Sequence, residues 1–261
     1  MAEPCLESKR AIVTGAGRGI GRACALALAR EGADVTIAAR SEADLRSLAE
    51  EIQKLGRRAV VCRCDVTDSR QVAQLSAVTL QAFGRLDILV NSAGSAAAHP
   101  FPDHPDEIWH QMLAVNMTGA YYVTKSVVAA MVAQRAGRII NIASTASRIG
   151  ARYIVAYTAA KHGVLGLTRA LATELVAHGI TVNAVCPGFA DTSLTQASIA
   201  RIVEATGRSS AEARRALEQK NPQNRLITPD EVAAAVVFLA RDSSYGINGQ
   251  AINIDGGEIQ S

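Results

Sequence analysis

A phenol and an ammonium stand four positions apart in the stretch YTAAK, residues 157 to 161. On a helix, residues at this spacing share one face, with Cβ atoms about 5–6 Å apart. A phenol can give a proton to a developing alkoxide, and a nearby ammonium favours the phenolate and so lowers the pKa of the phenol. Tyr157 and Lys161 are therefore candidates for proton transfer, although a solvated helix face would show the same spacing.

Two polar residues elsewhere in the chain could complete such a site. Ser144 ends the apolar run RIINIA, which reads as a strand, thirteen residues before Tyr157. At the carboxyl edge of a sheet its hydroxyl could donate to a carbonyl oxygen and hold that oxygen near the phenol. Asn116 lies within the predicted helix IWHQMLAVNMTGAYYVTKS, where a lone Asn more often makes local hydrogen bonds.

A glycine-rich loop, TGAGRGIG at residues 14 to 21, follows the first predicted strand and opens a helix. Gly15 permits a tight turn, Gly19 lets the backbone approach a pyrophosphate, and Gly21 allows the helix to pack closely on the strand. The first turn of the helix presents unpaired N–H groups to the anion. Strand, loop and helix together predict a dinucleotide site.

Seven short β-branched runs alternate with Ala- and Leu-rich stretches of helical period. Such alternation predicts an α/β fold with a doubly wound parallel sheet of about seven strands, covered by helices on both faces. No linker or repeat interrupts it, so a single domain over residues 1–261 is expected. The predicted strands span residues 10–14, 34–39, 58–64, 87–91, 138–143, 180–186 and 250–254.

Residues 189–228 break this rhythm, because they hold polar helical segments and no strand. An insertion after a strand end faces the ligand crevice of an α/β sheet, so this segment is a candidate substrate lid, with a plain surface excursion as the alternative. It carries Arg201, Arg208, Arg214 and Arg215, which could attract the phosphates of coenzyme A or of an acyl-carrier arm. Glutamates lie among these arginines, and a salt-bridged, solvated helix explains the pattern better.

The chain resembles the short-chain dehydrogenase/reductase family over nearly its whole length. The resemblance rests on TGxxxGxG, NSAG at 91 to 94, VNMTG, NIAS, YTAAK and PGFADT at 187 to 192, all in the family's order. It implies a catalytic tetrad of Asn116, Ser144, Tyr157 and Lys161, in which the lysine also bonds the nicotinamide ribose and the asparagine holds a water. The implied cofactor-binding residues outside the tetrad are Gly15, Arg18, Gly19, Ile20, Gly21, Arg40, Asp65, Val66, Asn91, Ala93, Gly94, Pro187, Gly188, Phe189 and Thr192, and Tyr157 and Lys161 belong to this set as well.

The end of the second predicted strand should select the cofactor. An acidic residue about 20 positions past the loop would bond the ribose 2′-hydroxyl of NAD. This chain has Ala39, Arg40 and Ser41 there, and Arg40 with Arg18 could clamp a 2′-phosphate. NADP(H) is therefore predicted over NAD(H), which stays open because Glu42 or Asp44 could reach back.

Composition limits the partners of the protein. The chain has 27 Lys and Arg against 24 Asp and Glu, a net charge too small to indicate a nucleic-acid or membrane surface. The N-terminus MAEPCLESKR lacks the apolar core of a signal peptide, so a cytoplasmic protein is expected. The five cysteines read as reduced structural thiols, and neither they nor the five histidines show the spacing of metal ligands.

The nearest likeness within the family is to bacterial 3-oxoacyl thioester reductases and to the ketoreductases of aromatic polyketide synthesis. It rests on GRIINIAST, AAKHGVLGLTRAL and GITVNAVCPGF, which are mostly cofactor and scaffold sequence. The resemblance implies a small-molecule carbonyl or alcohol substrate, either free or thioester-linked, and a homotetramer. A dehydrogenase of a small or cyclic alcohol, polyol or steroid is the alternative, and a non-catalytic dinucleotide-binding sensor is a remote one.

Overall fold

Seven parallel strands form one sheet in the order β3-β2-β1-β4-β5-β6-β7 in the computed structural model, which describes residues 5 to 260. The expectation about a signal peptide rests in part on residues 1 to 4, which lie outside this range. The strand order reverses between β1 and β4, and ligands of such sheets bind beyond the carboxyl ends of the strands at that point. The strands are β1 (Arg10–Thr14), β2 (Asp34–Ala39), β3 (Ala59–Arg63), β4 (Ile88–Asn91), β5 (Gly137–Ile142), β6 (Ile180–Pro187) and β7 (Ala251–Ile254).

The central strands are apolar on both faces because helices cover both faces. Every residue of β4, β5 and β6 is buried, so these strands lack the alternation that a half-exposed strand would show. All seven predicted strands are confirmed, and each end lies within one residue of its expected position.

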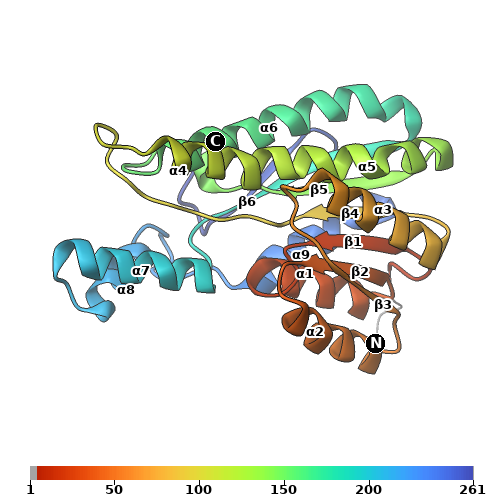
Figure 1. Ribbon diagram of the computed structural model, residues 1–261, viewed down its shortest axis with the longest axis horizontal. Helices are drawn as coiled ribbons and strands as arrows, with labels where there is room; N and C mark the ends of the chain where they lie inside the picture. The colour runs from red at the N-terminus through yellow and green to blue at the C-terminus, as the bar shows by residue number, and fades with distance from the viewer. Residues whose placement is uncertain (1–4, 261) are drawn as a thin grey trace.

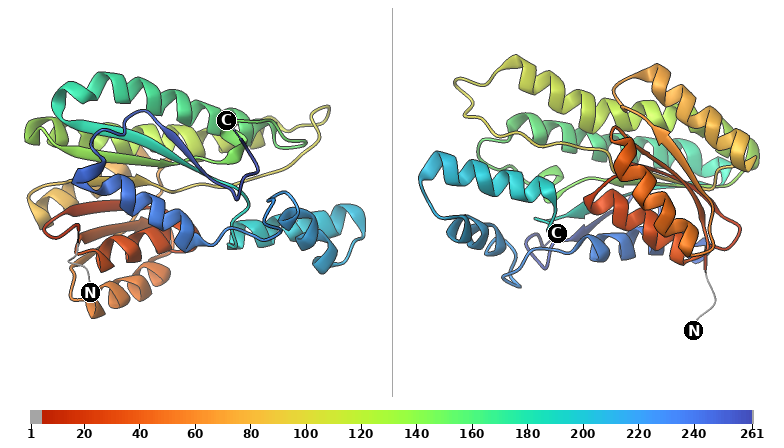
Figure 2. Two further views of the ribbon diagram at one scale, coloured as in Figure 1. Left: turned by 180° about the vertical axis from the view of Figure 1, so that it is seen from behind. Right: turned by 60° about the horizontal axis from the view of Figure 1, so that its bottom comes forward.

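Three helices pack on each face of the sheet (Figures 1 and 2). One face carries α1 (Gly19–Arg30), α2 (Glu42–Lys54) and α9 (Pro229–Ala240), whose buried side chains share one apolar cluster. The other carries α3 (Ser69–Phe83), α5 (Gly119–Gln134) and α6 (Val155–Leu175), which bury a second cluster. This arrangement confirms the predicted α/β fold.

Glycines follow the ends of the first three helices. Gly32, Gly56 and Gly84 follow the ends of α1, α2 and α3, and each has the positive φ that terminates a helix favourably. Among the described residues, no helix combines the length and the apolar character needed to cross a membrane.

The helical stretch around Asn116 is not one regular helix. Helix α4 (Asp106–Leu113) leads into a π-helical turn, Ala114–Thr118, before α5 begins at Gly119. Such a turn has one extra residue and is frequent at functional sites. The sequence predicted helix here without this distortion, and the distortion centres on Asn116.

The insertion at 189–228 forms α7 (Ser193–Thr206) and α8 (Ser210–Glu218), which project beyond the sheet at the left of Figure 1. They bury a small cluster of their own, formed by Ile199, Ala213, Leu217 and Leu226. An isolated β-bridge between Ala190 and Ile227 joins the chain segments that enter and leave the insertion. The insertion is therefore a packed unit attached at its base.

The chain returns from the insertion through the first turn of α9. The contacts of this turn predict that the stability of the fold depends on pH. Thr228 and Glu231 form a reciprocal cap, and Arg225 pairs with Glu231 at 2.6 Å. The Arg225 guanidinium lowers the pKa of Glu231 from 4.5 to about 2. Because the folded-state pKa is lowered, the stabilisation is complete above about pH 4.5 and is lost as the pH falls through about 2.

Glu231→Gln should therefore lower Tm by about 2–4 °C at neutral pH, as expected for the loss of a cap contribution near 1 kcal/mol. The difference from the parent protein should shrink as the pH falls from 4.5 toward 2, because the parent carboxyl becomes neutral as well. Thermal unfolding followed by circular dichroism measures both effects. Glu50→Gln, on the exposed face of α2, is the control, and an equal loss there would contradict the assignment.

Candidate active site

Ser144 stands at the carboxyl edge of the sheet, directly after β5. Its backbone is extended, its hydroxyl accepts a hydrogen bond from the N–H of Ala146 at 3.1 Å, and its N–H donates to the Ser147 hydroxyl at 3.0 Å. These reciprocal bonds fix the turn that follows the strand. They leave the Ser144 hydroxyl proton free to point toward Tyr157, with which it shares a side-chain hydrogen bond.

Tyr157 and Lys161 lie one turn apart on α6, as the spacing predicts. Lys161 is buried, and its ammonium Nζ donates to the carbonyl of Ile142 at 2.8 Å and lies 5.7 Å from the centre of the Tyr157 ring. An ammonium has three donors, so two remain for other partners. Burial lowers the pKa of Lys161 to about 8.

The pKa of Tyr157 does not behave as the sequence predicts. Burial raises it above the ordinary value, and the hydrogen bond with Ser144 only partly opposes that rise. The Lys161 ammonium donates to the Ile142 carbonyl rather than to the phenol oxygen. The burial of the phenol, which raises its pKa, therefore outweighs any effect of the ammonium. In the protein by itself, the raised pKa favours the protonated form of the Tyr157 phenol.

Asn116 is buried in the π-helical turn, where it holds a neighbouring loop. Its Nδ2 donates to the carbonyls of Ser95 at 2.9 Å and Met112 at 3.0 Å, and its Oδ1 accepts the N–H of Ser95 at 3.2 Å. A Cβ placed on Gly94 would lie 2.9 Å from Asn116 Oδ1 and 3.8 Å from Lys161 Nζ. Asn116 and Lys161 thus meet at Gly94, and the fold brings all four tetrad candidates to one place.

The glycine-rich loop lies against the NSAG segment, which begins at the last residue of β4. The hydroxyl of Thr14, at the end of β1, accepts the N–H groups of Ser92 at 3.1 Å and Ala93 at 3.2 Å. Gly15 has φ +66°, and a Cβ there would meet Ala93 backbone atoms at 2.8 Å. Gly15, Ala93 and Gly94 therefore converge where the strand order reverses.

Other expected cofactor residues border the same edge. Thr192 approaches Gly19, since a Cβ on that glycine would lie 3.2 Å from Thr192 Cγ2. Ile20 packs on the apolar core under the loop, and Pro187 pairs with Ile254 at the end of β6. Gly188 follows Pro187 and donates its N–H to the Ile254 carbonyl of β7. Phe189 packs against the apolar cluster shared by α7 and α8.

The start of α1 differs from the starts of α2 and α3. No side chain caps α1, and its first turn holds no acidic residue, whereas Ser41 and Asp68 cap α2 and α3. The side chain of Arg18, at the N-cap position, is exposed. The uncapped N–H groups and this guanidinium suit an anion at the end of the loop.

Basic and acidic side chains both lie after β2, where the protein would distinguish NADP(H) from NAD(H). Arg40 is exposed, and its charge contributes to lowering the pKa of the Asp65 carboxyl. Glu42 is engaged by Arg46 at 2.6 Å, but the carboxylate of Asp44 lies 3.5 Å from where a Cβ on Gly17 would stand. Asp44 therefore lies near the loop, whereas Glu42 is paired with Arg46.

Three expected cofactor residues have structural contacts of their own. The Asn91 amide donates inward to Thr124 at 3.0 Å and to Asn141 at 2.8 Å, so this side chain is turned away from the loop. Asp65 Oδ1 accepts hydrogen bonds from the N–H and the hydroxyl of Thr67, which form a turn after β3. Val66 is buried against Gly119.

Glu258 belongs to this region and was not identified from the sequence. Its Oε2 lies 3.2 Å from where a Cβ on Gly188 would stand, and it is buried without a hydrogen-bond partner among the described residues. Burial and the neighbouring Asp255 raise the pKa of its carboxyl. No local pattern marks Glu258, because only the turn after β7 brings it under Gly188.

Two of the four arginines considered in the insertion have hydrogen-bond or ion-pair partners. Arg214 pairs with Glu218 at 2.8 Å and with Asp191 at 3.1 Å, while Arg201 donates to the Ala96 carbonyl and to Ser198. Arg208 and Arg215 are exposed. The salt-bridged interpretation of this segment therefore fits Arg214, whereas Arg201 reaches across to the loop after β4.

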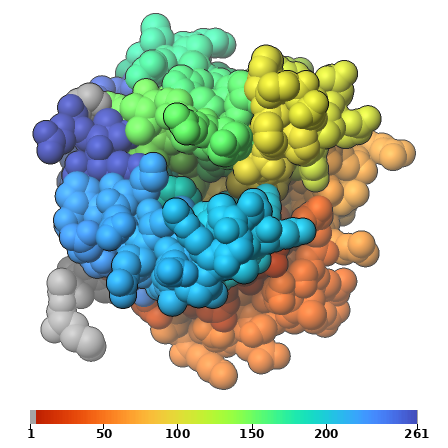
Figure 3. All heavy atoms as spheres, turned by 90° about the vertical axis from the view of Figure 1, so that its left-hand side faces the viewer, coloured from red at the N-terminus to blue at the C-terminus, as the bar shows by residue number. Residues whose placement is uncertain are grey.

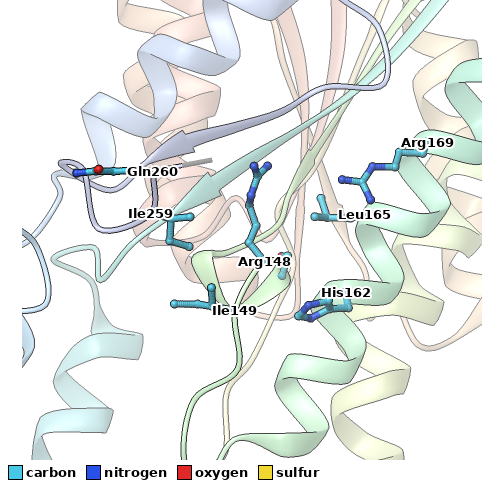
Figure 4. A pocket seen from close by; sticks show the side chains of 8 residues that line it. Arg148, Ile149, His162, Leu165, Arg169, Ile259 and Gln260 are labelled. Atoms are coloured by element: carbon cyan, nitrogen blue, oxygen red, sulfur yellow. The ribbon is translucent and has the colours of Figure 1, made fainter.

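Two cavities flank the tetrad without containing it. One, of about 550 Å³, lies on the side of α6 that bears His162 and Arg169, and Figure 4 shows Arg148 turned into the same space. The other, of about 540 Å³, lies beside Arg18, Gly19 and Thr192. The second cavity adjoins the end of the glycine-rich loop.

Comparison with known proteins bears on the chain as a whole. Residues 15–258 match the family model described as "Enoyl-(Acyl carrier protein) reductase". A "putative ketoacyl reductase" of Streptomyces coelicolor is 38% identical over 253 residues, which cover 96% of this chain and 97% of that protein. The 3-oxoacyl-[acyl-carrier-protein] reductase FabG of Thermotoga maritima is 37% identical, over 97% of this chain and 99% of its own length.

A solved structure shares the fold closely. A variant of the actinorhodin polyketide ketoreductase, crystallised with NADPH, superposes with a TM-score of 0.93 at 37% identity. The match covers 96% of this chain and 97% of that one.

The contact between Gly15 and Ala93 makes a specific prediction about stability. Gly15→Ala and Gly207→Ala each place a Cβ on a glycine of similar φ, +66° and +69°, but nothing lies within 4 Å of a Cβ at Gly207. Both variants should lose about 1 kcal/mol from the left-handed backbone. Gly15→Ala should lose at least about 1–3 kcal/mol more, because its Cβ overlaps the Ala93 backbone.

Urea unfolding of the two variants measures the difference. Equal free energies of unfolding would mean that the loop can shift away from Ala93, and would contradict the close packing described above.

Proposed function

Because the chain belongs to the short-chain dehydrogenase/reductase family and is an oxidoreductase of carbonyl and CH–OH groups, we propose that it is an NADP(H)-dependent ketoreductase of 3-oxoacyl thioesters or polyketide-like ketones. One observation carries the site assignment. Ser144, Tyr157, Lys161 and Asn116 converge at the carboxyl edge of the sheet, beside a glycine-rich loop whose helix has no side-chain cap.

The residues present fit a nicotinamide dinucleotide. The uncapped start of α1 suits the pyrophosphate, and Gly19 lets the loop backbone approach the phosphates. The two free donors of Lys161 suit ribose hydroxyls. When bound, the nicotinamide supplies or accepts the hydride.

Each catalytic side chain has a role that its contacts support. Tyr157 gives its proton to the carbonyl oxygen during reduction, and its raised pKa keeps that proton available at neutral pH. Ser144 holds the same oxygen through its hydroxyl. Lys161 stabilises negative charge on the phenol oxygen, with a pKa near 8 that makes its charge sensitive to pH. Asn116 fixes the loop at Ser95, and the family resemblance implies that it holds a water linking Lys161 to solvent.

The choice of cofactor follows from Arg18 and Arg40. Both guanidiniums are exposed at the edge where the adenosine end would lie, and the related ketoreductase structure was solved with NADPH. NAD(H) is the alternative, supported by the Asp44 carboxylate near Gly17. Asp65 and Val66 would border the adenine, as the family resemblance implies.

The substrate class follows from the relatives, whose names describe ketoacyl reductases and a polyketide ketoreductase. A second candidate is the oxidation of a polyol or another hydroxylated alcohol. One relative, 35% identical over 254 residues, is named L-rhamnose 1-dehydrogenase.

We also propose that residues 1–261 form one domain with residues 189–228 as its substrate lid, acting as a cytoplasmic homotetramer. Large exposed side chains such as Tyr121 on α5 and Phe238 on α9 would suit interfaces between subunits.

The substrate proposal is tested by initial rates with NADPH on two ketones, acetoacetyl-CoA and an unsubstituted cyclic ketone. The expected result is a kcat/KM at least about tenfold higher for acetoacetyl-CoA, equivalent to about 1.4 kcal/mol in transition-state binding. A preference for the cyclic ketone, or faster oxidation of a polyol, would favour the second candidate.

Tyr157→Phe should lose most of kcat and keep NADPH binding by fluorescence titration, and retained turnover would refute the tetrad.

A pair of variants decides the cofactor. Arg40→Gln should lower kcat/KM for NADPH by about 10–100-fold, as expected for loss of a charge-assisted hydrogen bond, and leave NADH unchanged. Asp44→Asn should leave NADPH use intact. If Asp44→Asn instead impairs NADH use while Arg40→Gln has no effect on either cofactor, the protein selects NAD(H) through Asp44.

A further inference from the structure

An arginine of α7 hydrogen-bonds the loop after β4. In the described part of the chain, one side-chain hydrogen bond runs from α7 or α8 to the body outside residues 189–228, and Arg201 makes it. Arg201 Nη1 donates to the carbonyl of Ala96 at 3.1 Å, while Nη2 donates to Ser198 on its own helix at 3.2 Å. The guanidinium is thereby oriented from within α7 toward the loop after β4.

The two ends of this contact belong to parts of the molecule that are otherwise separate. Helices α7 and α8 pack mainly on each other, around the cluster of Ile199, Ala213, Leu217 and Leu226. Figure 3 shows this end of the molecule, with the blue and cyan surface of the lid below the green and yellow segments and a hollow between them. Arg201 therefore joins two sides of the opening to the candidate site.

The loop that receives Arg201 is held by the catalytic asparagine. Both backbone groups of Ser95, the residue before Ala96, bond the side chain of Asn116 at 3.2 and 2.9 Å. Gly94, one residue earlier, faces both Asn116 Oδ1 and Lys161 Nζ. Gly94, Ser95 and Ala96 thus connect the Arg201 guanidinium to the buried side chains of Asn116 and Lys161.

This short connection has little freedom to absorb a shift. Asn116 is held within the π-helical turn by its bond to the Met112 carbonyl at 3.0 Å. Further along the loop, the N–H of His99 donates to the carbonyl of Tyr153 at 2.7 Å, and Tyr153 has a left-handed backbone with φ +70°. The segment from Gly94 to His99 is therefore fixed at both ends, with Arg201 bound between them.

We propose that Arg201 is a positioning residue that couples the placement of the lid to the catalytic pair Asn116 and Lys161. When α7 lies over the site, Arg201 holds the Ala96 carbonyl, and the Ser95 backbone keeps Asn116 in its catalytic position. When α7 moves away, this restraint is lost. The inference rests on the proposed function for its catalytic consequence, but the mechanical coupling is independent of any substrate.

Amide hydrogen exchange of the full-length protein tests the coupling without a substrate. Arg201→Met should accelerate exchange in α7 and also in peptides covering residues 94–96 and 114–118. Glu204→Met is the matched control, since Glu204 is an exposed residue on the same helix, and it should leave both loop peptides unchanged. Faster exchange confined to α7, or no change in either region, would overturn the proposal.

Kinetics separate positioning from simple closure of the lid. Arg201→Met should lower kcat at saturating substrate by about tenfold, because small displacements of catalytic groups cost that much or more. Arg201→Lys should restore most of kcat, since an ammonium can still donate to Ala96. An increase in KM with unchanged kcat would mean that Arg201 only retains substrate, and would overturn the catalytic part.

A double-mutant cycle locates the effect. In an Asn116→Ser background, Arg201→Met should change kcat by less than about twofold, because the group through which it acts is gone. A full tenfold loss in that background would show that Arg201 acts by another route. If the parent enzyme reduces no ketone at all, the proposed function fails, while the exchange measurement still decides the coupling.

Discussion

The hydrogen bonds that the Thr14 hydroxyl accepts from Ser92 and Ala93 hold the rest of the site in place. They join the last residue of β1 to the segment after β4, at the point where the strand order of the sheet reverses. The glycine-rich loop leaves from one side of this junction and the loop to Ser95 leaves from the other. Because Gly15 lies directly on the Ala93 backbone, the two loops cannot move independently.

Burial is the second constraint on the chemistry. It raises the pKa of Tyr157 and lowers that of Lys161, so it favours the neutral form of both groups. The protein offsets part of this effect with the Ser144 hydrogen bond and with the Ile142 carbonyl, which accepts from the ammonium. A phenol that retains its proton suits carbonyl reduction, whereas oxidation of an alcohol needs the phenolate, which the positive charge of an oxidised nicotinamide would favour.

The insertion at 189–228 packs as a unit of its own beside the sheet. Its helices bury their own cluster, and the chain enters and leaves it through the bridge between Ala190 and Ile227. The caps of α7 and α9 at Thr192 and Thr228 fix the two ends of the insertion. Arg201 reaches from this unit to the Ala96 carbonyl, so the insertion is also joined to the loop after β4.

The sequence by itself determined the order of elements, the seven strands to within one residue at each end, the glycine stops and the residue types of the tetrad. These features depend on near neighbours in the chain, because periodicity, turn residues and short motifs are local. Only the tertiary structure decided which way side chains point. Asn91 bonds Asn141 fifty residues away, and Arg201 bonds Ala96 across 105 residues. The π-helical turn at Asn116, the raised pKa of Tyr157 and the place of Glu258 also come from packing between distant segments, which no local pattern encodes.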